Sequence, residues 1–142
     1  FSQGWNLISL PVYPRSYDLV ELFDVSWLNF WGYDLTSRRY YPANWASVGS
    51  GLFVLSLMEH SFDVVGCPVE RLRVNYAEGW NLIGSIWEET TIGEGSPPGS
   101  LDPMLLFGYD SASGSYVPVT ALETGKGYWL GARNSGYTIL PP

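Results

Sequence analysis

One pentapeptide occurs twice in this chain, letter for letter, and that duplication constrains the fold more than any other feature. Gly4–Ile8 and Gly79–Ile83 both have the sequence GWNLI and begin 75 residues apart. Three further landmarks recur in the same order at a spacing of 76 residues: Gly32-Tyr33-Asp34 with Gly108-Tyr109-Asp110, Pro42 with Pro118, and Gly49 with Gly125. Ordered matches at constant spacing indicate an internal repeat. The sequence therefore predicts two diverged copies of one unit.

The repeat sets the expected organisation of the chain. We predict a first β repeat unit at residues 1–66, a connecting strand at 67–78 and a second β repeat unit at 79–142. The two copies should pack together as one body with a pseudo-two-fold relation. In that case residues 4–66 superpose on 79–140, with Trp5 over Trp80 and Tyr33 over Tyr109.

Short apolar segments bounded by glycine, proline or acidic residues indicate strands rather than helices. The predicted strands are 5–12, 27–33, 52–57, 62–65, 71–76, 80–87, 104–109, 128–133 and 137–140. Asp34 and Asp110 should each begin a hairpin turn, because an aspartate accepts hydrogen bonds from the backbone that follows it. Residues 17–23 have a helical pattern with Ser16 as the cap, whereas the matching stretch 91–100 is rich in glycine and proline and predicts a loop. The predicted fold class is all-β and antiparallel, a β-sandwich with one short helix in the first copy.

Composition and charge exclude two classes of partner. The chain has 142 residues, only seven Lys and Arg, and a formal net charge of −7. A nucleic-acid or anionic membrane surface requires clustered basic residues, so neither is an expected partner. No apolar stretch approaches the roughly 18 residues of a membrane-spanning helix, so we expect no membrane insertion.

Residues that carry chemistry are scarce. The single cysteine, Cys67, and the single histidine, His60, cannot form a metal cluster. We expect Cys67 to be a small buried residue, with an intermolecular disulfide as the alternative, and His60 to lie exposed in a turn. The adjacent carboxylates Glu88 and Glu89 would point to opposite faces of a strand. The sequence therefore predicts no catalytic residues, no metal site, no cofactor and no enzymatic activity.

The aromatic residues fall into two groups. The chain holds seven Trp, ten Tyr and six Phe. Positions that are aromatic in both copies, such as Trp5 and Trp80, most simply fill the same core position twice, so we expect them to be buried. Other aromatic residues have no aromatic counterpart and are available for stacking on sugars or for protein contacts. The candidate ligand or interface residues are Trp45, Tyr41, Asn44, Trp27 and Trp87.

The order of GWNLI, a GYD turn and GKGYW resembles a repeat module of large secreted and cell-surface proteins of bacteria and archaea. The second copy is the closer match, through Gly79–Gly84, Gly108–Asp110 and Gly125–Trp129. The first copy departs from the pattern at Ser50, Leu52 and Phe53, where Lys, Tyr and Trp are usual. The resemblance implies an extracellular β module and brings no catalytic residues with it.

These observations favour a non-catalytic extracellular or cell-surface module. The chain begins at Phe1 without a methionine, which suggests a mature end after signal-peptide removal or a fragment of a longer protein. The leading hypothesis is a self-associating structural subunit of an appendage, filament or surface layer, with copies of itself or flanking modules as partners. The alternative is a carbohydrate-binding or adhesive module with polysaccharide as partner.

A possible missing strand supports the self-association hypothesis. Residues 71–76 predict a strand directly before the second GWNLI segment, whereas only three residues precede the first. An unpaired edge beside residues 5–10 would invite a strand from a neighbouring molecule. The alternative is that residues 71–76 merely connect the copies and that the sheet is already complete. The backbone partners of residues 5–10 distinguish the two.

Overall fold

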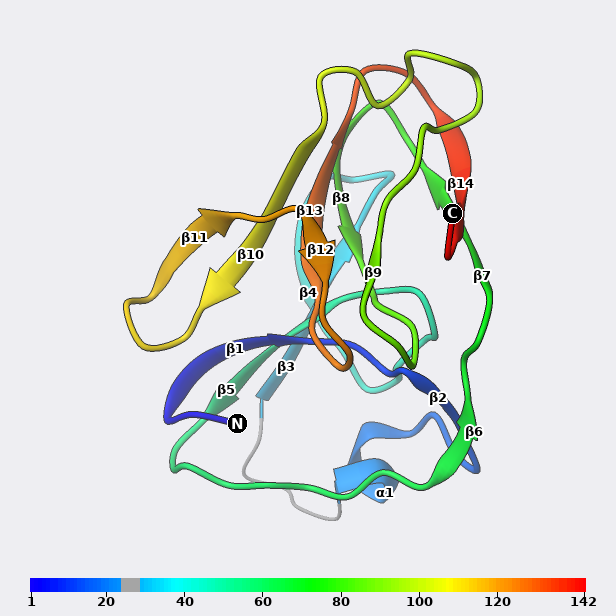
Figure 1. Ribbon diagram of the computed structural model, residues 1–142. Coiled ribbons are helices and arrows are strands. Elements are labelled where there is room, and N and C mark those ends of the chain that lie inside the picture. The colour runs from blue at the N-terminus through cyan, green and yellow to red at the C-terminus, as the bar shows by residue number, and fades with distance from the viewer. Residues whose placement is uncertain (24–28) are drawn as a thin grey trace.

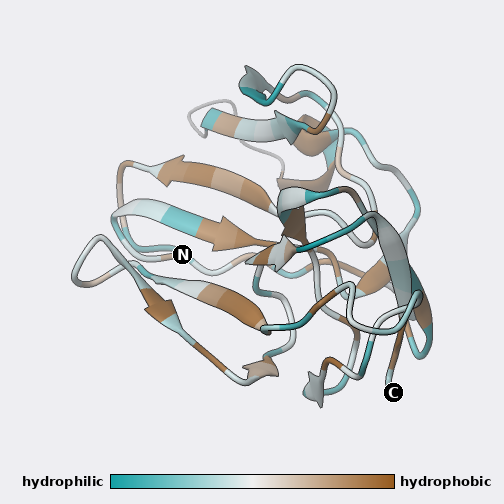
Figure 2. Ribbon diagram, turned by 90° about the horizontal axis from the view of Figure 1, so that it is seen from above, coloured by the Kyte–Doolittle hydropathy of each residue, from teal (hydrophilic) through white to brown (hydrophobic). Residues whose placement is uncertain are grey.

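The computed structural model describes residues 1–23 and 29–142 (Figure 1). Within these ranges the regular structure is antiparallel β, apart from the short helix α1 at Leu19–Phe23. The all-β prediction is confirmed. Figure 2 shows brown, hydrophobic segments along many of the strands, whereas several of the turns are more hydrophilic.

Two four-stranded sheets form the body of the molecule, and their strands follow the same spatial order. The first sheet has the order β1 (Gly4–Ile8), β5 (Leu52–Ser56), β3 (Asn29–Asp34), β4 (Arg39–Pro42). The second has the order β8 (Gly79–Ile83), β13 (Tyr128–Ala132), β10 (Leu105–Asp110), β11 (Ser115–Pro118). Each GWNLI strand therefore lies at one edge of its sheet, and each GYD hairpin lies at the other.

The register of the strands also matches between the sheets. Trp31 lies opposite Phe53 in the first sheet, and Phe107 lies opposite Trp129 in the second. The hairpins close on equivalent residues as well, because Asp34 accepts hydrogen bonds from Thr36 N and Ser37 Oγ at 3.0 and 2.9 Å. Asp110 accepts the corresponding bonds from Ala112 N and Ser113 Oγ at 3.1 and 2.9 Å. The predicted role of both aspartates is confirmed.

Backbone hydrogen bonds join the two sheets in exchanged pairs. The end of β1 meets the segment before β13, and the end of β8 meets the segment before β5. The four bonds are Ser9 N to Gly125 O (3.0 Å), Gly84 N to Gly49 O (2.9 Å), Gly127 N to Leu7 O (3.2 Å) and Gly51 N to Leu82 O (3.4 Å). Each bond thus has a counterpart between the equivalent residues of the other half.

The remaining strands form three two-stranded sheets. These pair β2 (Val12–Pro14) with β6 (Gly66–Pro68), β7 (Leu72–Tyr76) with β14 (Gly136–Leu140), and β9 (Thr90–Thr91) with β12 (Ala121–Leu122). The strand β7 was expected beside the second GWNLI strand, and this expectation is wrong. The turn between β7 and β8 sends the chain into another sheet, so no missing partner of β1 can be inferred from β7.

Three local expectations also need correction. Residues 62–65 form no strand, and the strand lies at β6 instead. Asp18, rather than Ser16, caps helix α1, because its Oδ1 accepts from Val20 N at 2.9 Å. Cys67 is exposed, since the short strand β6 lies at the surface. His60 is exposed, as predicted.

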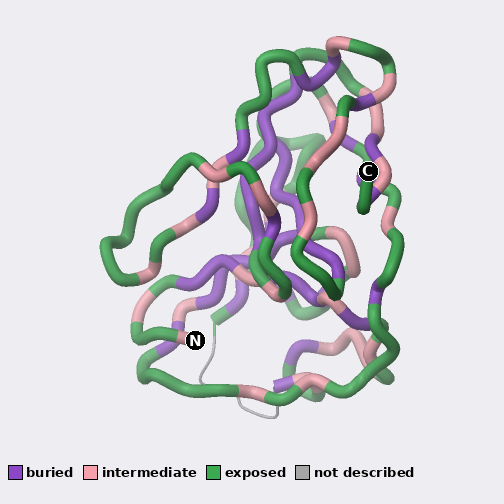
Figure 3. The backbone as a smooth tube through the Cα atoms, in the orientation of Figure 1, coloured by how far each residue is buried: buried purple, intermediate pink, exposed green. Residues whose placement is uncertain are grey.

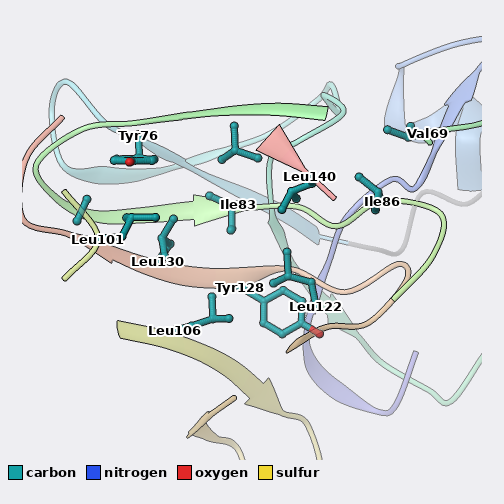
Figure 4. Packing of buried hydrophobic residues seen from close by; sticks show 12 residues of the cluster. Val69, Tyr76, Ile83, Ile86, Leu101, Leu106, Leu122, Tyr128, Leu130 and Leu140 are labelled. Carbon is teal, nitrogen blue, oxygen red and sulfur yellow. The ribbon is translucent and has the colours of Figure 1, made fainter. Parts of the chain in front are cut away.

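Buried side chains form a core in each half and a third cluster between them. Figure 3 shows where the buried residues lie along the backbone. The core of the second half includes Leu106, Leu122, Leu130, Leu140 and Tyr128 (Figure 4). The junction cluster consists of Leu7, Phe53, Leu82 and Trp129, with two equivalent residues from each half. Phe53 and Trp129 of this cluster also line the surface described next.

Candidate functional site: a paired aromatic groove

Two pockets open above the junction cluster, and both have aromatic walls. The Trp80 pocket, of about 420 Å³, is lined by Tyr33, Tyr40, Trp80, Phe107, Tyr116 and Trp129. The Trp5 pocket, of about 470 Å³, is lined by Trp5, Trp31, Tyr40, Phe53, Tyr109, Gly114 and Tyr116. Tyr40 and Tyr116 belong to both, so we treat the two pockets as one aromatic groove.

The two pockets are built from equivalent positions. Every lining residue of the Trp80 pocket has its counterpart, 75 or 76 residues away, in the lining of the Trp5 pocket. The ring contacts across the junction also come in equivalent pairs, in which a tyrosine of one half meets an aromatic residue of the other. Tyr33 meets Trp129 at 4.9 Å between centroids, and Tyr109 meets Phe53 at 5.7 Å. Each pocket therefore depends on side chains from both halves of the chain.

Trp5 and Trp80 are not core residues, and the prediction that they are buried is wrong. They are 39% and 42% exposed, whereas the neighbouring Asn6 and Asn81 are only 6% and 1% exposed. Successive residues of a strand face opposite sides, and in both strands the asparagine takes the buried side. The tryptophan is consequently directed to the outer surface.

The buried asparagine explains this inversion. Asn81 Oδ1 accepts from Ala77 N at 2.9 Å, and its Nδ2 donates to Ala77 O at 2.9 Å and Gly79 O at 3.1 Å. Asn6 makes the same three bonds to Ser2 and Gly4. The side chain thus satisfies the backbone that turns into the strand, and a buried amide with all its bonds made is stable in the interior. The signal in the sequence is a glycine two residues before the asparagine.

The polar ends of the rings in the groove have spare hydrogen-bonding capacity. The Tyr33 and Tyr109 hydroxyls and the indole N–H groups of Trp5, Trp31, Trp80 and Trp129 have no hydrogen-bond partner among the described residues. The polar atoms of Tyr33, Tyr109, Trp31 and Trp129 are not buried, because no buried side-chain N or O of the described non-exposed residues lacks a partner. Trp5 and Trp80 are themselves exposed residues. The groove therefore offers both apolar ring surface and free polar groups to a ligand.

Tyr40 lies at the centre of the groove, and its hydroxyl stays protonated. Burial and the neighbouring Tyr116 hydroxyl raise the pKa of Tyr40 to about 12. Among the described residues, no Asp, Glu, Lys or Arg side chain lines the groove. The aromatic groove is therefore uncharged over the whole physiological range of pH.

The rings do not form a flat platform. Tyr33 and Tyr40 meet at 69°, Tyr40 and Phe53 at 72°, and Trp80 and Phe107 at 64°. Edge-to-face arrangements of this kind are favourable for aromatic pairs and leave slots between the rings. A ligand would be enclosed by rings at different tilts instead of lying on one plane.

The residues singled out from the sequence lie elsewhere. Trp45 is 64% exposed and forms a backbone bridge with Asp18. Asn44 is exposed close by, and Tyr41 packs its ring over Gly32. None of the three lines the aromatic groove.

The remaining two candidates, Trp87 and Trp27, are not shown to lie with the other three. Trp87 is exposed and lines a separate pocket with Phe1 and Val12. Trp27 lies outside the described residues. The five candidates are thus not shown to form one site, and the duplicated aromatic residues form the groove instead.

Other kinds of site find little support in the described part of the chain. No group of three or more His, Cys, Asp or Glu side chains in residues 1–23 and 29–142 could hold a metal ion. In the same ranges no helix is long and apolar enough to cross a membrane. Comparison with protein-family models, curated proteins and solved structures finds no match to this chain.

Proposed function

We propose that this protein is a non-catalytic, extracellular carbohydrate-binding module and that the aromatic groove binds a neutral, single-chain, β-linked polysaccharide. The observation that carries the proposal is the repeated set of half-exposed aromatic residues. Trp5, Trp80, Tyr40 and Tyr116 are between 39% and 51% exposed, yet each is aromatic in both copies. Core packing explains buried repeats, but not repeats that stay at the surface.

The chemistry of the groove supports a sugar ligand. Pyranose rings with equatorial substituents present apolar C–H faces to aromatic rings and hydroxyls at their edges. The groove supplies ring faces together with free indole N–H and phenol groups, which suits an amphipathic ligand of this kind.

Charge and ring geometry narrow the ligand class. The lining is uncharged and the chain has a net charge of −7, so an anionic polysaccharide would be repelled at low ionic strength. The tilted rings do not fit a flat crystalline face. A soluble neutral chain can turn successive sugar rings toward walls of different tilt.

The proposal also includes an approximate two-fold relation between the copies. It is supported by the exchanged backbone bonds, the matching strand orders and the equivalent pocket linings. Two related pockets that share Tyr40 and Tyr116 would contact a polymer at two places. Simultaneous contact at linked sites raises affinity above that of either site alone.

A titration of tryptophan fluorescence tests the function. Neutral β-linked hexasaccharides, such as those of cellulose, xylan and mannan, are added to the wild type and to Trp5→Ala, Trp80→Ala and Trp87→Ala. Because aromatic anchors dominate small interfaces, we expect Trp5→Ala and Trp80→Ala each to weaken binding about tenfold or more. Trp87→Ala is the matched control, since Trp87 is exposed outside the groove. Binding that survives both groove substitutions would rule the groove out.

Self-association is the second candidate function. It is favoured by the outer strands β4 and β11, whose residues are all exposed and whose outer edges pair with no strand in the described part of the chain. Such edges can pair with another chain. Sedimentation velocity over a range of concentrations distinguishes this candidate, because self-association makes the sedimentation coefficient rise with concentration.

A further inference from the structure

The two hairpins that flank the groove differ at one equivalent position. Arg38 and Gly114 both adopt a left-handed backbone, with φ of 57° and 66°. Their N–H groups donate to Asp34 O and Asp110 O, each at 2.8 Å. Glycine adopts this conformation freely, whereas other residues do so at a cost of about 1 kcal/mol. The arginine is therefore expected to make a contact that offsets this cost.

Arg38 caps the outer edge of β8. Its Nη1 donates to Trp80 O at 2.6 Å, and its Nη2 donates to Glu78 O. The guanidinium also covers Gly79, where an added Cβ would lie 3.4 Å from Nη2. Arg38 therefore occupies the backbone acceptors beside the Trp80 pocket.

The equivalent acceptors beside the Trp5 pocket are uncovered. The carbonyls of Gln3 and Trp5 correspond to those of Glu78 and Trp80, and no donor from the described residues reaches them. Trp5 O faces away from β5, because backbone groups alternate along an edge strand and Leu7 O, two residues on, bonds to Gly127 N.

The space beside these carbonyls is also open. Gly114 lines the Trp5 pocket and has no side chain with which to reach the carbonyls. A Cβ added at Gly4 would meet no atom within 4 Å. The Trp5 end of the groove therefore combines free backbone acceptors with room for a ligand group.

We infer that the two ends of the groove differ, so that the groove is directional, and that the Trp5 pocket is the primary subsite. This inference rests on the proposed function. One further sugar ring lies beside Gly114 and donates hydroxyl hydrogens to the carbonyls of Gln3 and Trp5. At the other end the guanidinium of Arg38 occupies the matching acceptors and excludes that ring. A glycan chain therefore binds in one preferred direction.

The test exchanges the residues at positions 38 and 114. Affinity for cellohexaose is measured by calorimetry for the wild type, Gly114→Arg, Gly114→Ala, Arg38→Gly and the double variant Arg38→Gly/Gly114→Arg. We expect Gly114→Arg to weaken binding about tenfold, because the new guanidinium takes the two carbonyls. Gly114→Ala carries the same backbone strain and adds a single methyl group to the pocket wall, so it should weaken binding clearly less than Gly114→Arg does. The difference in affinity between the two variants measures the effect of the guanidinium. Thermal melts confirm that each variant is folded.

The double variant and the tryptophan variants complete the test. The double variant should recover the affinity of the wild type, with Trp80→Ala now more damaging than Trp5→Ala. In the wild-type background Trp5→Ala should be the more damaging of the two. Equal losses in that background, or a Gly114→Arg variant that binds like the wild type, would overturn the inference and leave the groove as a symmetric site. If the wild type bound no neutral hexasaccharide, the proposed function would be refuted, and the inferred direction of binding would be refuted with it.

Discussion

The hydroxyl groups of Ser9 and Ser85 lie 3.1 Å apart in the buried junction between the two halves. Ser9 directly follows the first GWNLI strand, and Ser85 lies two residues after the second. Ser9 Oγ donates to Lys126 O at 2.7 Å and accepts from Ser85 N at 3.0 Å, while Ser85 Oγ accepts from Gly125 N at 2.9 Å. These hydroxyls satisfy the backbone at the point where the halves meet.

Replacing Ser9 should therefore destabilise the whole protein. Ser9→Ala leaves Lys126 O and Ser85 N without their partner in a buried site, which costs about 1–3 kcal/mol of unfolding free energy. Urea denaturation followed by tryptophan fluorescence measures the loss. The exposed Ser47→Ala is the control and should change the unfolding free energy by less than about 0.5 kcal/mol. Equal values for the two variants would show that the junction does not depend on Ser9.

The asparagines of the two GWNLI strands should matter more for stability than the tryptophans beside them. Asn81→Ala removes bonds to Ala77 and Gly79 from a site that is 1% exposed, at a cost of about 2–3 kcal/mol. Asn81→Asp should be at least as damaging at neutral pH, since a carboxylate would face the Ala77 and Gly79 carbonyls. Denaturant midpoints measure both, with the exposed Asn44→Ala as control.

Substituting a buried aromatic residue of the groove should reduce the unfolding free energy more than substituting a half-exposed one. Trp129 is buried in the junction cluster, so Trp129→Ala should cost about 3–5 kcal/mol. Trp80 is half-exposed, and Trp80→Ala should cost about 1–2 kcal/mol. Thermal and urea unfolding compare the two. A Trp80→Ala loss as large as that of Trp129→Ala would place Trp80 in the core after all.

The raised pKa of Tyr40 predicts a late step in an alkaline titration. An ordinary tyrosine has a pKa of 10.0, and burial raises that of Tyr40 to about 12. Between these values the unfolded chain has lost the proton that the folded chain keeps. The stability that depends on neutral Tyr40 is therefore complete below about pH 10 and falls as the pH rises through about 12.

Ultraviolet absorbance of the tyrosinate ion measures this step. Tyr40→Phe should remove one late-titrating group from the folded protein, whereas the exposed Tyr13→Phe should leave that group in place. Burial also raises the pKa of Tyr128, so the number of late-titrating groups is compared between variants. Loss of one such group in Tyr13→Phe, or an unchanged number of them in Tyr40→Phe, would contradict the assignment.

The fold class could be predicted from the sequence because it depends on local patterns. Short apolar segments, two aspartate turns and recurring short motifs are visible without any knowledge of contacts. The partner of residues 71–76 could not be predicted in this way. Nearness in the chain suggested β8, but β7 pairs with β14, more than 50 residues farther along the chain. Pairing across sheets depends on how the halves meet, which no local pattern specifies.

The candidate site was missed for a related reason. A duplicated tryptophan was assigned to the core, since apolar residues prefer burial. In this fold the asparagine beside it takes the buried face, because the amide completes the bonds of the preceding turn. Burial of a polar residue depends on whether its bonds can be made, and that depends on the turn geometry. The clue lay in the whole GWN tripeptide, not in the tryptophan alone.

The exchanged backbone bonds at the junction are of the type that joins two subunits of a symmetric dimer, where residue i meets j and j meets i. In a dimer of identical chains every substitution appears twice, so the two ends of a shared surface must stay the same. One continuous chain removes that restriction. A substitution at position 38 need not be accompanied by one at position 114. The two ends of a surface that began alike can therefore become different.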